Sequence, residues 1–376
     1  MKFHLVSGGC GFVGRNVAKH LYRTTNDTVI IVDDLSVGVS PANWIAVEDT
    51  FGTNEPNSST SMLELWEGKG HARPDYLDGD AHMEFWGDDD RIVFWQGDFR
   101  RFLRYMLSDK AWINKLFGAE RFNDVFHFAA IVGGRAKIDG DPMMVALDLA
   151  IDAEFFYWAV RHQPDRVLYP SSSAAYPVNL QGETDHTPLA EKDIDWAGGN
   201  LGQPDMTYGW SKLTGEYLAQ TAAEHYGLSV TCIRPVSGYG EDQDLSYPVP
   251  AIAARAAGKE DPFEVWGTGK QGRDFVHIDD VIDCMLFAMD HVKDGSGINI
   301  GSGKITSFLE IIDVFTGFAG YKPTVKQLLD KPVGVHARYA QMDYVFNELG
   351  WRPKISLEEG MRRVYDQALR NRAKQG

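Results

Sequence analysis

The feature that most constrains this sequence is a glycine-rich turn near its start. The segment Ser7–Gly14 reads Ser-Gly-Gly-Cys-Gly-Phe-Val-Gly and separates an apolar stretch, Lys2–Val6, from an amphipathic one, Phe12–Tyr22. A second apolar stretch, Thr28–Val32, follows. Strand, glycine turn, helix and strand in this order predict a βαβ unit. Glycines in such a turn let the backbone approach a pyrophosphate at the helix N-terminus.

The glycines match the two common dinucleotide-binding patterns. Gly8, Gly11 and Gly14 fit GxxGxxG, and Gly9, Gly11 and Gly14 fit GxGxxG. The pattern is weak alone, but its place between a strand and a helix makes it specific. The second strand ends at Asp33, close to the position expected for an acidic residue that binds the adenosine ribose hydroxyls. Because a carboxylate there repels a 2′-phosphate, the sequence predicts NAD rather than NADP.

Apolar stretches and helical patterns alternate along the rest of the chain. We expect strands at Ile92–Trp95, Asp124–Phe128, Arg166–Tyr169, Ser229–Ile233 and Ile298–Ile300. We expect helices at Met143–Arg161, Tyr208–Tyr226, Val249–Gly258, Ser307–Gly317 and Leu357–Asn371. The alternation predicts an α/β fold: a doubly wound parallel sheet (Rossmann) with a smaller C-terminal substrate-binding region. Residues 1–240 would form the NAD-binding domain, and residues 241–376 mainly the substrate region, with some segments returning to the first domain.

One segment, Val37–Asp90, interrupts this alternation. It is rich in Gly, Asp, Asn, Ser and Pro, carries scattered Trp and Phe, and shows no sustained periodicity. Long irregular stretches inside a domain are usually functional. Two interpretations stay open: a surface insertion packed by its own aromatic residues, or a cover over the active site or a dimer surface.

The composition excludes several classes of partner. Asp and Glu outnumber Lys and Arg by 53 to 37, and the net charge of -16 disfavours binding to nucleic acid or to an anionic membrane. The three cysteines, Cys10, Cys232 and Cys284, are far apart and lie in apolar segments, which predicts reduced thiols. The start of the chain lacks the pattern of a secretion signal, and no apolar run is long enough to span a membrane. We therefore expect a cytoplasmic protein.

Two polar patterns suggest chemistry. Tyr208 and Lys212 are four residues apart, on one face of a predicted helix. An adjacent ammonium and a positive nicotinamide ring both favour the phenolate, a base that can take a proton from a secondary alcohol as hydride leaves. Ser171–Ser173 follow the strand Arg166–Tyr169, where hydroxyls point into the ligand crevice of a parallel sheet. The alternatives are an exposed helical pair and a polar turn.

Eight motifs occur in the order expected for a known family. They read GGCGFVG, VDDLS, GDFR, HFAA, SSSAAY, YGWSK, RPVSGYG and GRDFVHIDD. The chain resembles the extended short-chain dehydrogenase/reductase family, which comprises the NAD-dependent epimerases and dehydratases of nucleotide-sugars. This resemblance implies a nucleotide-sugar substrate, NAD, no metal site, and a homodimer formed through the helices at 143–161 and 208–226.

The resemblance also implies roles for individual residues. Ser172, Tyr208 and Lys212 would be catalytic, and Lys212 would also hold the nicotinamide ribose. Besides Tyr208 and Lys212, the NAD contacts would be Gly8, Gly11, Phe12, Val13, Gly14, Asp33, Asp34, Ser36, Asp98, Phe99, Ala129 and Ala130, with Asp98 beside the adenine and Ala129 beside the nicotinamide. The substrate contacts would be Gly133, Ser173, Ser237, Arg273 and Arg338, and the guanidinium groups of the two arginines suit a pyrophosphate.

The reaction type depends on where the sequence departs from family patterns. The segments 129–134 and 334–343 are similar to the GDP-mannose 3,5-epimerase branch. Family dehydratases, however, carry Asp-Glu after the catalytic hydroxyl, and the 3,5-epimerase and fucose synthase branches carry Cys at the second position. Here Ser173 and Ala174 occupy these positions and supply no effective acid or base. Ser237 stands where the family has a phosphate-contacting Asn.

These departures favour C4 epimerisation through a transient 4-keto sugar, as in the UDP-galactose 4-epimerase branch. Tyr208 and the cofactor suffice for it. A nucleotide-sugar dehydrogenase or ketoreductase would use the same residues, and a 3,5-epimerase is a further alternative. A non-catalytic NAD-binding regulator is the alternative from another class, although such a protein gains nothing from keeping Ser172, Tyr208 and Lys212 together.

Overall fold

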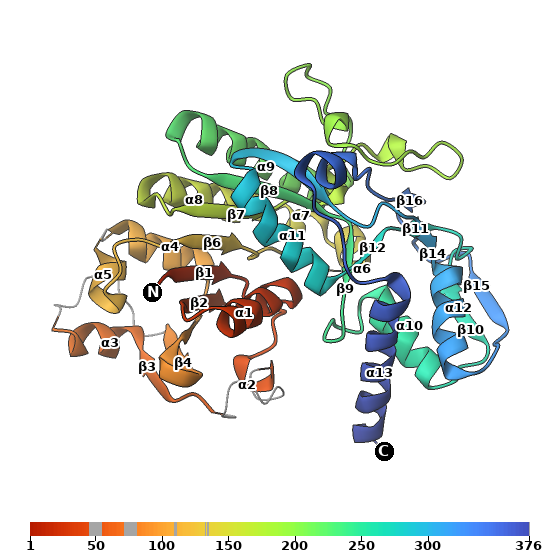
Figure 1. Ribbon diagram of the computed structural model, residues 1–376, viewed down its shortest axis with the longest axis horizontal. Coiled ribbons are helices and arrows are strands. Elements are labelled where there is room, and N and C mark those ends of the chain that lie inside the picture. Colours follow the sequence, from red (N-terminus) through yellow and green to blue (C-terminus); the bar gives the residue numbers. More distant parts are fainter. Residues whose placement is uncertain (45–54, 71–80, 109–110, 132, 134, 376) are drawn as a thin grey trace.

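A large twisted sheet organises the molecule (Figure 1). The computed structural model describes residues 1–44, 55–70, 81–108, 111–131, 133 and 135–375. The strand order is β13-β8-β7-β6-β1-β2-β5-β4-β3, and the pairs from β13 to β5 are all parallel. These parallel strands are β1 (Phe3–Ser7), β2 (Thr28–Asp33), β5 (Ile92–Gln96), β6 (Asp124–His127), β7 (Arg166–Pro170), β8 (Val230–Pro235) and β13 (Asp294–Ile300). The doubly wound α/β prediction is confirmed.

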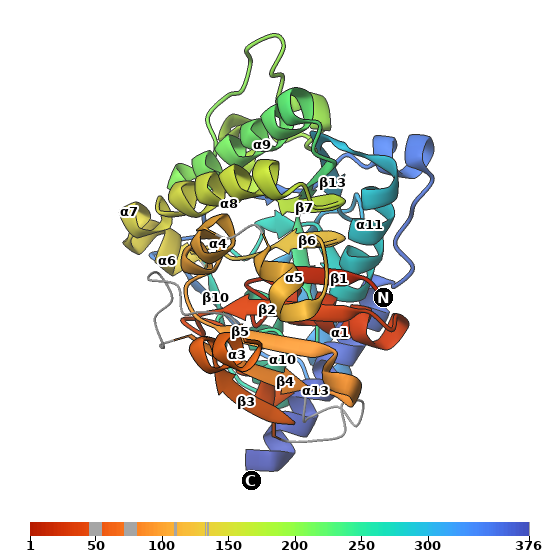
Figure 2. The same cartoon turned by 90° about the vertical axis from the view of Figure 1, so that its left-hand side faces the viewer.

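Helices cover both faces of the sheet, and each face has its own apolar core (Figure 2). One core contains residues of α4 (Phe99–Ser108), α8 (Asp148–His162) and α9 (Met206–Tyr226). The other contains residues of α1 (Phe12–Thr24) and α11 (Ile278–His291). The strands between them are near-continuous apolar runs, as expected for strands buried on both faces. Their carboxyl ends are therefore the open edge at which ligands bind.

A smaller region follows β8 and β9 (Ser237–Tyr239). Its core is formed by α10 (Pro248–Ala257), α12 (Phe308–Ala319) and α13 (Leu357–Gln375). Short strands surround it: β10 (Phe263–Trp266) pairs with β15 (Val325–Leu328), β11 (Gly272–Arg273) pairs with β14 (Thr306–Ser307) and β16 (Ala337–Arg338), and β12 (Phe275–His277) pairs with β9. Between these segments the chain returns to the large sheet through α11 and β13.

The expectation that Val37–Asp90 lacks regular structure is wrong for the part that the structure describes. Strands β3 (Ser58–Ser61) and β4 (His82–Trp86), with α3 (Met62–Gly68) between them, extend the sheet in antiparallel fashion beyond β5. The strand β3 reads Ser-Ser-Thr-Ser and has no alternation of apolar residues. Its extended conformation is therefore stabilised by pairing with β4 and not by its own side-chain pattern. Residues 45–54 and 71–80 lie outside the described residues, and a covering role of this insertion stays a prediction.

Four aromatic or sulfur-containing side chains of the described insertion are buried in the main domain. Met62 and Met83 join the core on the α8 face, and Trp44 and Trp86 join the core on the α1 face. This arrangement fits an insertion that packs on its own domain.

The helix expected at Met143–Arg161 is interrupted. The structure has α7 (Pro142–Val145) and then α8, which begins at Asp148. The side chain of Asp141 accepts a hydrogen bond from the Met144 amide and caps α7. The Asp148 carboxylate accepts a hydrogen bond from the Ile131 amide (2.5 Å), which fixes the start of α8 beside the loop after β6.

Candidate active site

The glycine turn is packed too tightly for other residues. Gly8 has a φ of 64°, and a Cβ there would lie 2.6 Å from the backbone nitrogen of Ala129. A Cβ on Gly14 would collide with the carbonyl oxygen of Gly8. The Gly11 amide donates to that same oxygen (3.0 Å), and α1 begins at the next residue. The turn thus places Phe12, Val13 and Gly14, the start of α1, at the carboxyl end of β1.

Asp33 supports this turn from the end of β2. Its carboxylate accepts hydrogen bonds from the amides of Cys10 (2.9 Å) and Leu35 (2.8 Å). Burial raises the pKa of Asp33 above its ordinary value, although these hydrogen bonds oppose the rise. Asp34 and Ser36 are exposed beside it. The carboxylate therefore has a fixed position, and its contact with a ribose stays a prediction.

The residues expected along the rest of the cofactor follow β5 and β6. Asp98 binds Arg100 (2.9 Å), and although burial alone would raise the pKa of Asp98, this arginine holds it below its usual range. The ring of Phe99 lies 5.4 Å from that of His127. Ala129, which precedes Ala130, donates its amide hydrogen to Ser7 Oγ (3.2 Å). Gly133 is on the same loop, next to residues that the structure does not describe.

The start of α9 packs on the turn that follows β7. Ser172 Oγ accepts a hydrogen bond from the Ala174 amide (3.1 Å), and a short 3-10 helix, Ser173–Ala175, follows. The Asp205 amide donates to the carbonyl of Ala174 (2.9 Å), and a Cβ on Gly209 would collide with that carbonyl. The structure therefore brings Tyr208, which lies between Asp205 and Gly209, to the turn that carries Ser172.

Tyr208 and Lys212 lie on one face of α9. The Lys212 Nζ atom is 6.0 Å from the centroid of the Tyr208 ring and 5.4 Å from that of Tyr169. Lys212 is buried, whereas Tyr208 is half-buried. Burial alone would lower the pKa of Lys212, but Asp152 outweighs it, with help from Tyr208 and Asp148, and raises the pKa. Lys212 is therefore an ammonium group in a site with little water.

The two arginines expected at a pyrophosphate lie opposite each other. Arg273 of β11 and Arg338 of β16 are register partners. Arg338 donates to Asp205 (2.9 Å) and to Gln181 (2.6 Å), which places it beside the start of α9. Arg273 donates to the carbonyl oxygen atoms of Gly272 and His336.

The last expected substrate residue, Ser237, lies in β9 at the start of the smaller region. Its amide donates to the Asp274 carbonyl of the neighbouring strand segment (3.0 Å).

Sequence reasoning missed several residues at this site. Tyr247, which precedes α10, has its pKa raised by burial and then by Tyr208, so the two phenols interact electrostatically. No pattern marks Tyr247, because it lies in an irregular loop. Asp205 and Gln181 also lack a signal. Asp152 does have one: it is a carboxylate within the largely apolar segment of α8.

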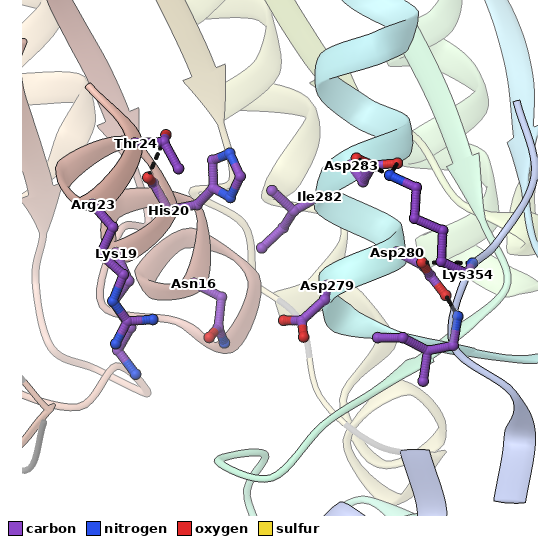
Figure 3. A pocket seen from close by; sticks show the side chains of 11 residues that line it. Asn16, Lys19, His20, Arg23, Thr24, Asp279, Asp280, Ile282, Asp283 and Lys354 are labelled. Carbon is purple, nitrogen blue, oxygen red and sulfur yellow. Dashed lines mark hydrogen bonds and ion pairs between the residues drawn. The ribbon is translucent and has the colours of Figure 1, made fainter. Parts of the chain in front are cut away.

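A separate hollow lies between α1 and α11 (Figure 3). Lys19, His20 and Asp279 line it, together with an ion pair between Lys354 and Asp283 (2.9 Å). None of the expected catalytic, cofactor or substrate residues belongs to its lining. We assign it no part in the active site.

A family model described as the NAD dependent epimerase/dehydratase family matches residues 4–301. The chain belongs to this family. Among curated relatives, it is 28% identical to GDP-L-fucose synthase of Sinorhizobium fredii over 268 residues, which cover 69% of this chain and 83% of the relative. It is also 28% identical to GDP-mannose 3,5-epimerase of Arabidopsis thaliana over 251 residues, 65% of each chain.

Solved structures share the fold over the whole chain. UDP-glucose 4-epimerase from Thermotoga maritima has a TM-score of 0.71 at 22% identity, and the match covers 99% of both chains. The dTDP-glucose 4,6-dehydratase DesIV from Streptomyces venezuelae, solved with NAD bound, has a TM-score of 0.73 at 20% identity and covers 100% of this chain and 98% of its own. At these identities the likeness shows the fold.

Family membership confirms that the chain is an NAD-dependent enzyme of the epimerase/dehydratase type. The glycine turn fits this cofactor, because Gly8 and Gly14 let the backbone turn tightly just before the N-terminus of α1, where a pyrophosphate can bind. Among the described residues, no helix is both long and apolar enough to cross a membrane. The relatives carry out several different reactions, so family membership leaves the reaction of this enzyme open.

Proposed function

We propose that this enzyme is a nucleotide-sugar 4-epimerase that works through a transient 4-keto sugar and retains its NAD. The observation that carries the proposal is the convergence of Ser172, Tyr208 and Lys212 at one turn, while the next two positions, Ser173 and Ala174, carry no acid or base. Chemistry at C3, C5 or C6 requires such a group, whereas exchange at C4 needs one base and a hydride acceptor.

Each residue has a defined task in this mechanism. When bound, NAD supplies the acceptor and donor of hydride for the ring carbon. Tyr208 takes the proton of the 4-hydroxyl and later returns it, and the Lys212 ammonium stabilises the phenolate between these steps. Ser172 donates a hydrogen bond to the same sugar oxygen. Epimerisation requires the 4-keto sugar to present its other face before hydride returns.

The substrate diphosphate would be held at the register pair Arg273 and Arg338. Guanidinium groups bind phosphate oxygens in a bidentate manner and supply local positive charge in a protein of net charge -16. Arg338 contacts Asp205, three residues before Tyr208, so the diphosphate site lies beside the catalytic helix. We propose that the enzyme acts in the cytoplasm, where its three buried free cysteines stay reduced.

The second candidate is a nucleotide-sugar dehydrogenase or ketoreductase. It uses the same residues but releases its cofactor after each turnover. Curated relatives include GDP-L-fucose synthases, so a GDP-sugar is a candidate substrate for either reaction. The mass of a co-purifying nucleotide-sugar and the redox state of retained nicotinamide separate the candidates.

The test is turnover of candidate nucleotide-sugars in D2O. We expect no deuterium on any ring carbon, because the C4 hydrogen travels as hydride and Tyr208 exchanges only the hydroxyl proton. Deuterium at C3 or C5 would contradict the proposal, since it requires an enolised ketone and a further acid/base. Tyr208→Phe should lower kcat by about a thousandfold or more with little change in NAD affinity.

A further inference from the structure

A chain of buried polar groups runs beneath the active site. The Ser7 hydroxyl and His127 Nδ1 are 2.9 Å apart, and His127 Nε2 lies 3.0 Å from Asp152 Oδ1. The Tyr169 hydroxyl donates to Asp152 Oδ2 (2.6 Å). Asp152 and His127 are almost completely inaccessible to water. The chain connects the strand before the glycine turn to the helix α8.

The donor and acceptor roles of these groups determine which atoms carry the protons along this chain. The Asp152 carboxylate can only accept, so His127 Nε2, which faces it, carries a proton and donates it to Asp152. A neutral His127 has no second proton, so its Nδ1 atom accepts the hydrogen of the Ser7 hydroxyl, while Ser7 Oγ accepts from the Ala129 amide. Burial lowers the pKa of His127, which agrees with a neutral imidazole. Asp152 therefore receives two neutral donors and keeps its full negative charge.

A buried carboxylate that only neutral groups contact requires a positive charge nearby. Lys212 supplies it. Helices α8 and α9 pack against each other, and Tyr169 touches both charges: its hydroxyl binds Asp152 and its ring lies 5.4 Å from Lys212 Nζ. Burial alone would raise the pKa of Asp152, but Lys212, followed by His127, holds it below the ordinary value.

We propose that Asp152 is a positioning residue for the reaction: it is the buried counter-ion that holds the Lys212 ammonium group on the Tyr208 side of α9. The proposal rests on the function of Lys212 proposed above, in which this ammonium binds the nicotinamide ribose and stabilises the phenolate. Without the carboxylate, Lys212 would lose its proton at alkaline pH and with it both contacts. Asp152 is buried and would act through Lys212.

Several other titratable groups also face Lys212 and could contribute to its charge balance. They are Asp148 of α8, His127 of β6, Tyr169 of β7, Tyr208 of α9 and Cys232 of β8. Asp148 also favours the ammonium, but less strongly than Asp152. His127 is neutral, and the pKa values of Tyr169 and Cys232 are raised by burial, so these two groups are also uncharged. Asp152 is therefore the main counter-charge.

The experiment measures NAD+ binding, with no sugar present, by calorimetry at about pH 7 and about pH 9.5. Wild-type affinity should change little across this range. Asp152→Asn should lose roughly tenfold in affinity between the two pH values, because removing a neighbouring opposite charge lowers the pKa of Lys212 by about one to three pH units. Tyr169→Phe, which keeps the Asp152 charge, should behave like the wild type.

Asp124 provides a matched control at the opposite end of β6. It is a buried carboxylate that lies 3.0 Å from His4 Nδ1 and 2.6 Å from Arg166 Nε. Asp124→Asn removes a comparable charge but should leave the pH dependence of NAD+ binding unchanged. A folded Asp152→Asn protein whose NAD+ affinity varies with pH as in the wild type would overturn the proposal.

A double-mutant cycle covers the case in which Asp152→Asn folds poorly. Unfolding by urea is compared for the wild type, Asp152→Asn, Lys212→Met and the double variant. The proposal expects Asp152→Asn to destabilise the protein far less in the Lys212→Met background, and equal losses would overturn it. Because the cycle needs neither NAD nor substrate, its result separates this inference from a failure of the proposed function.

Discussion

Residue by residue, the buried charges of this protein are matched to partners on other elements. Asp33 supports the glycine turn, Asp124 binds two basic side chains, Glu216 binds Arg234, and Asp152 stands near Lys212. A buried charge without a partner costs several kcal/mol, so each pair restricts how its elements can pack. The pairs also make specific predictions for single substitutions.

The position of Asp33 predicts the choice of cofactor. Its carboxylate is held by the Cys10 and Leu35 amides and cannot rotate away from a 2′-phosphate. We expect NAD(H) to bind at least about a hundredfold more tightly than NADP(H), and Asp33→Asn to reduce the difference by about tenfold because the repulsion is lost. Calorimetric titration of both cofactors measures this difference. Equal affinities in the wild type would show that Asp33 does not select NAD(H) over NADP(H).

Asp124 predicts a pH-dependent part of the stability. Burial alone would raise its pKa, but His4 and Arg166 lower the pKa to about 2. Because the folded-state value is depressed, the stabilisation is complete above the ordinary pKa of 3.8 and is lost as the pH falls toward about 2. Asp124→Asn should reduce the free energy of unfolding by about 2 kcal/mol at neutral pH and by about half as much near pH 3. Urea unfolding at both pH values checks this, and an equal loss at both would contradict it.

Among the elements, α9 combines catalysis with structural support. One turn beyond Lys212, Glu216 binds Arg234 of β8 (2.7 Å) and accepts a hydrogen bond from Ser171. Arg234 also donates to the Tyr176 hydroxyl (3.0 Å), which in turn donates to Asn299 of β13 (2.8 Å). The helix that carries Tyr208 is thus fixed to β8, to the turn after β7 and, through Tyr176, to β13.

This network predicts a large effect for one substitution. Glu216→Ala should lower the free energy of unfolding by roughly 3–5 kcal/mol, because the Arg234 guanidinium is left buried without its carboxylate. Arg234→Met combined with Glu216→Ala should recover part of the loss. Denaturant unfolding of the three proteins measures this, and a loss below about 1 kcal/mol for the single variant would show that the pair is dispensable.

The same elements show what the sequence could predict. Strands such as Thr28–Asp33 and Val230–Pro235 are buried on both faces, so their apolar runs are plain in the sequence. The helix α9 was expected within two residues of its bounds. The strand β3 has no such pattern because its order comes from a neighbour. The helix α11, which follows a turn-rich segment, was not predicted. For the site, motifs predicted which residues come together, whereas Asp205, Tyr247 and Gln181 are brought there only by tertiary packing.

At the scale of the whole molecule, α7, α8 and α9 lie together (Figure 2), and exposed apolar residues make up part of their surface. Its exposed side chains include Met143, Met144, Leu149, Tyr157 and Tyr217. Such a patch is typical of a protein–protein interface. The family resemblance predicts that a second copy of the chain covers this surface, so that the helices of the two copies form a four-helix bundle. This homodimer stays a prediction.

We expect light scattering to give about twice the chain mass of 42.0 kDa at micromolar concentration. Tyr217→Asp should shift the protein toward the monomer, because it places a charge in the apolar interface. Leu329→Asp changes an exposed apolar residue of the smaller region, just after β15, and should leave the mass unchanged. A monomeric wild type would contradict the dimer.

The return of the chain to the large sheet limits how this protein can be recombined with its relatives. The segment α11–β13 belongs to the same apolar core as α1, yet it is flanked on both sides by parts of the smaller region. A chimaera joined once, after β9, would import a foreign edge strand and a foreign covering helix along with the new pocket. Because the smaller region is the predicted substrate-binding region, an exchange of sugar specificity would require two separate segments to be transplanted, one before α11 and one after β13, with the host's own Ile298 and Val281 left in place to close its core.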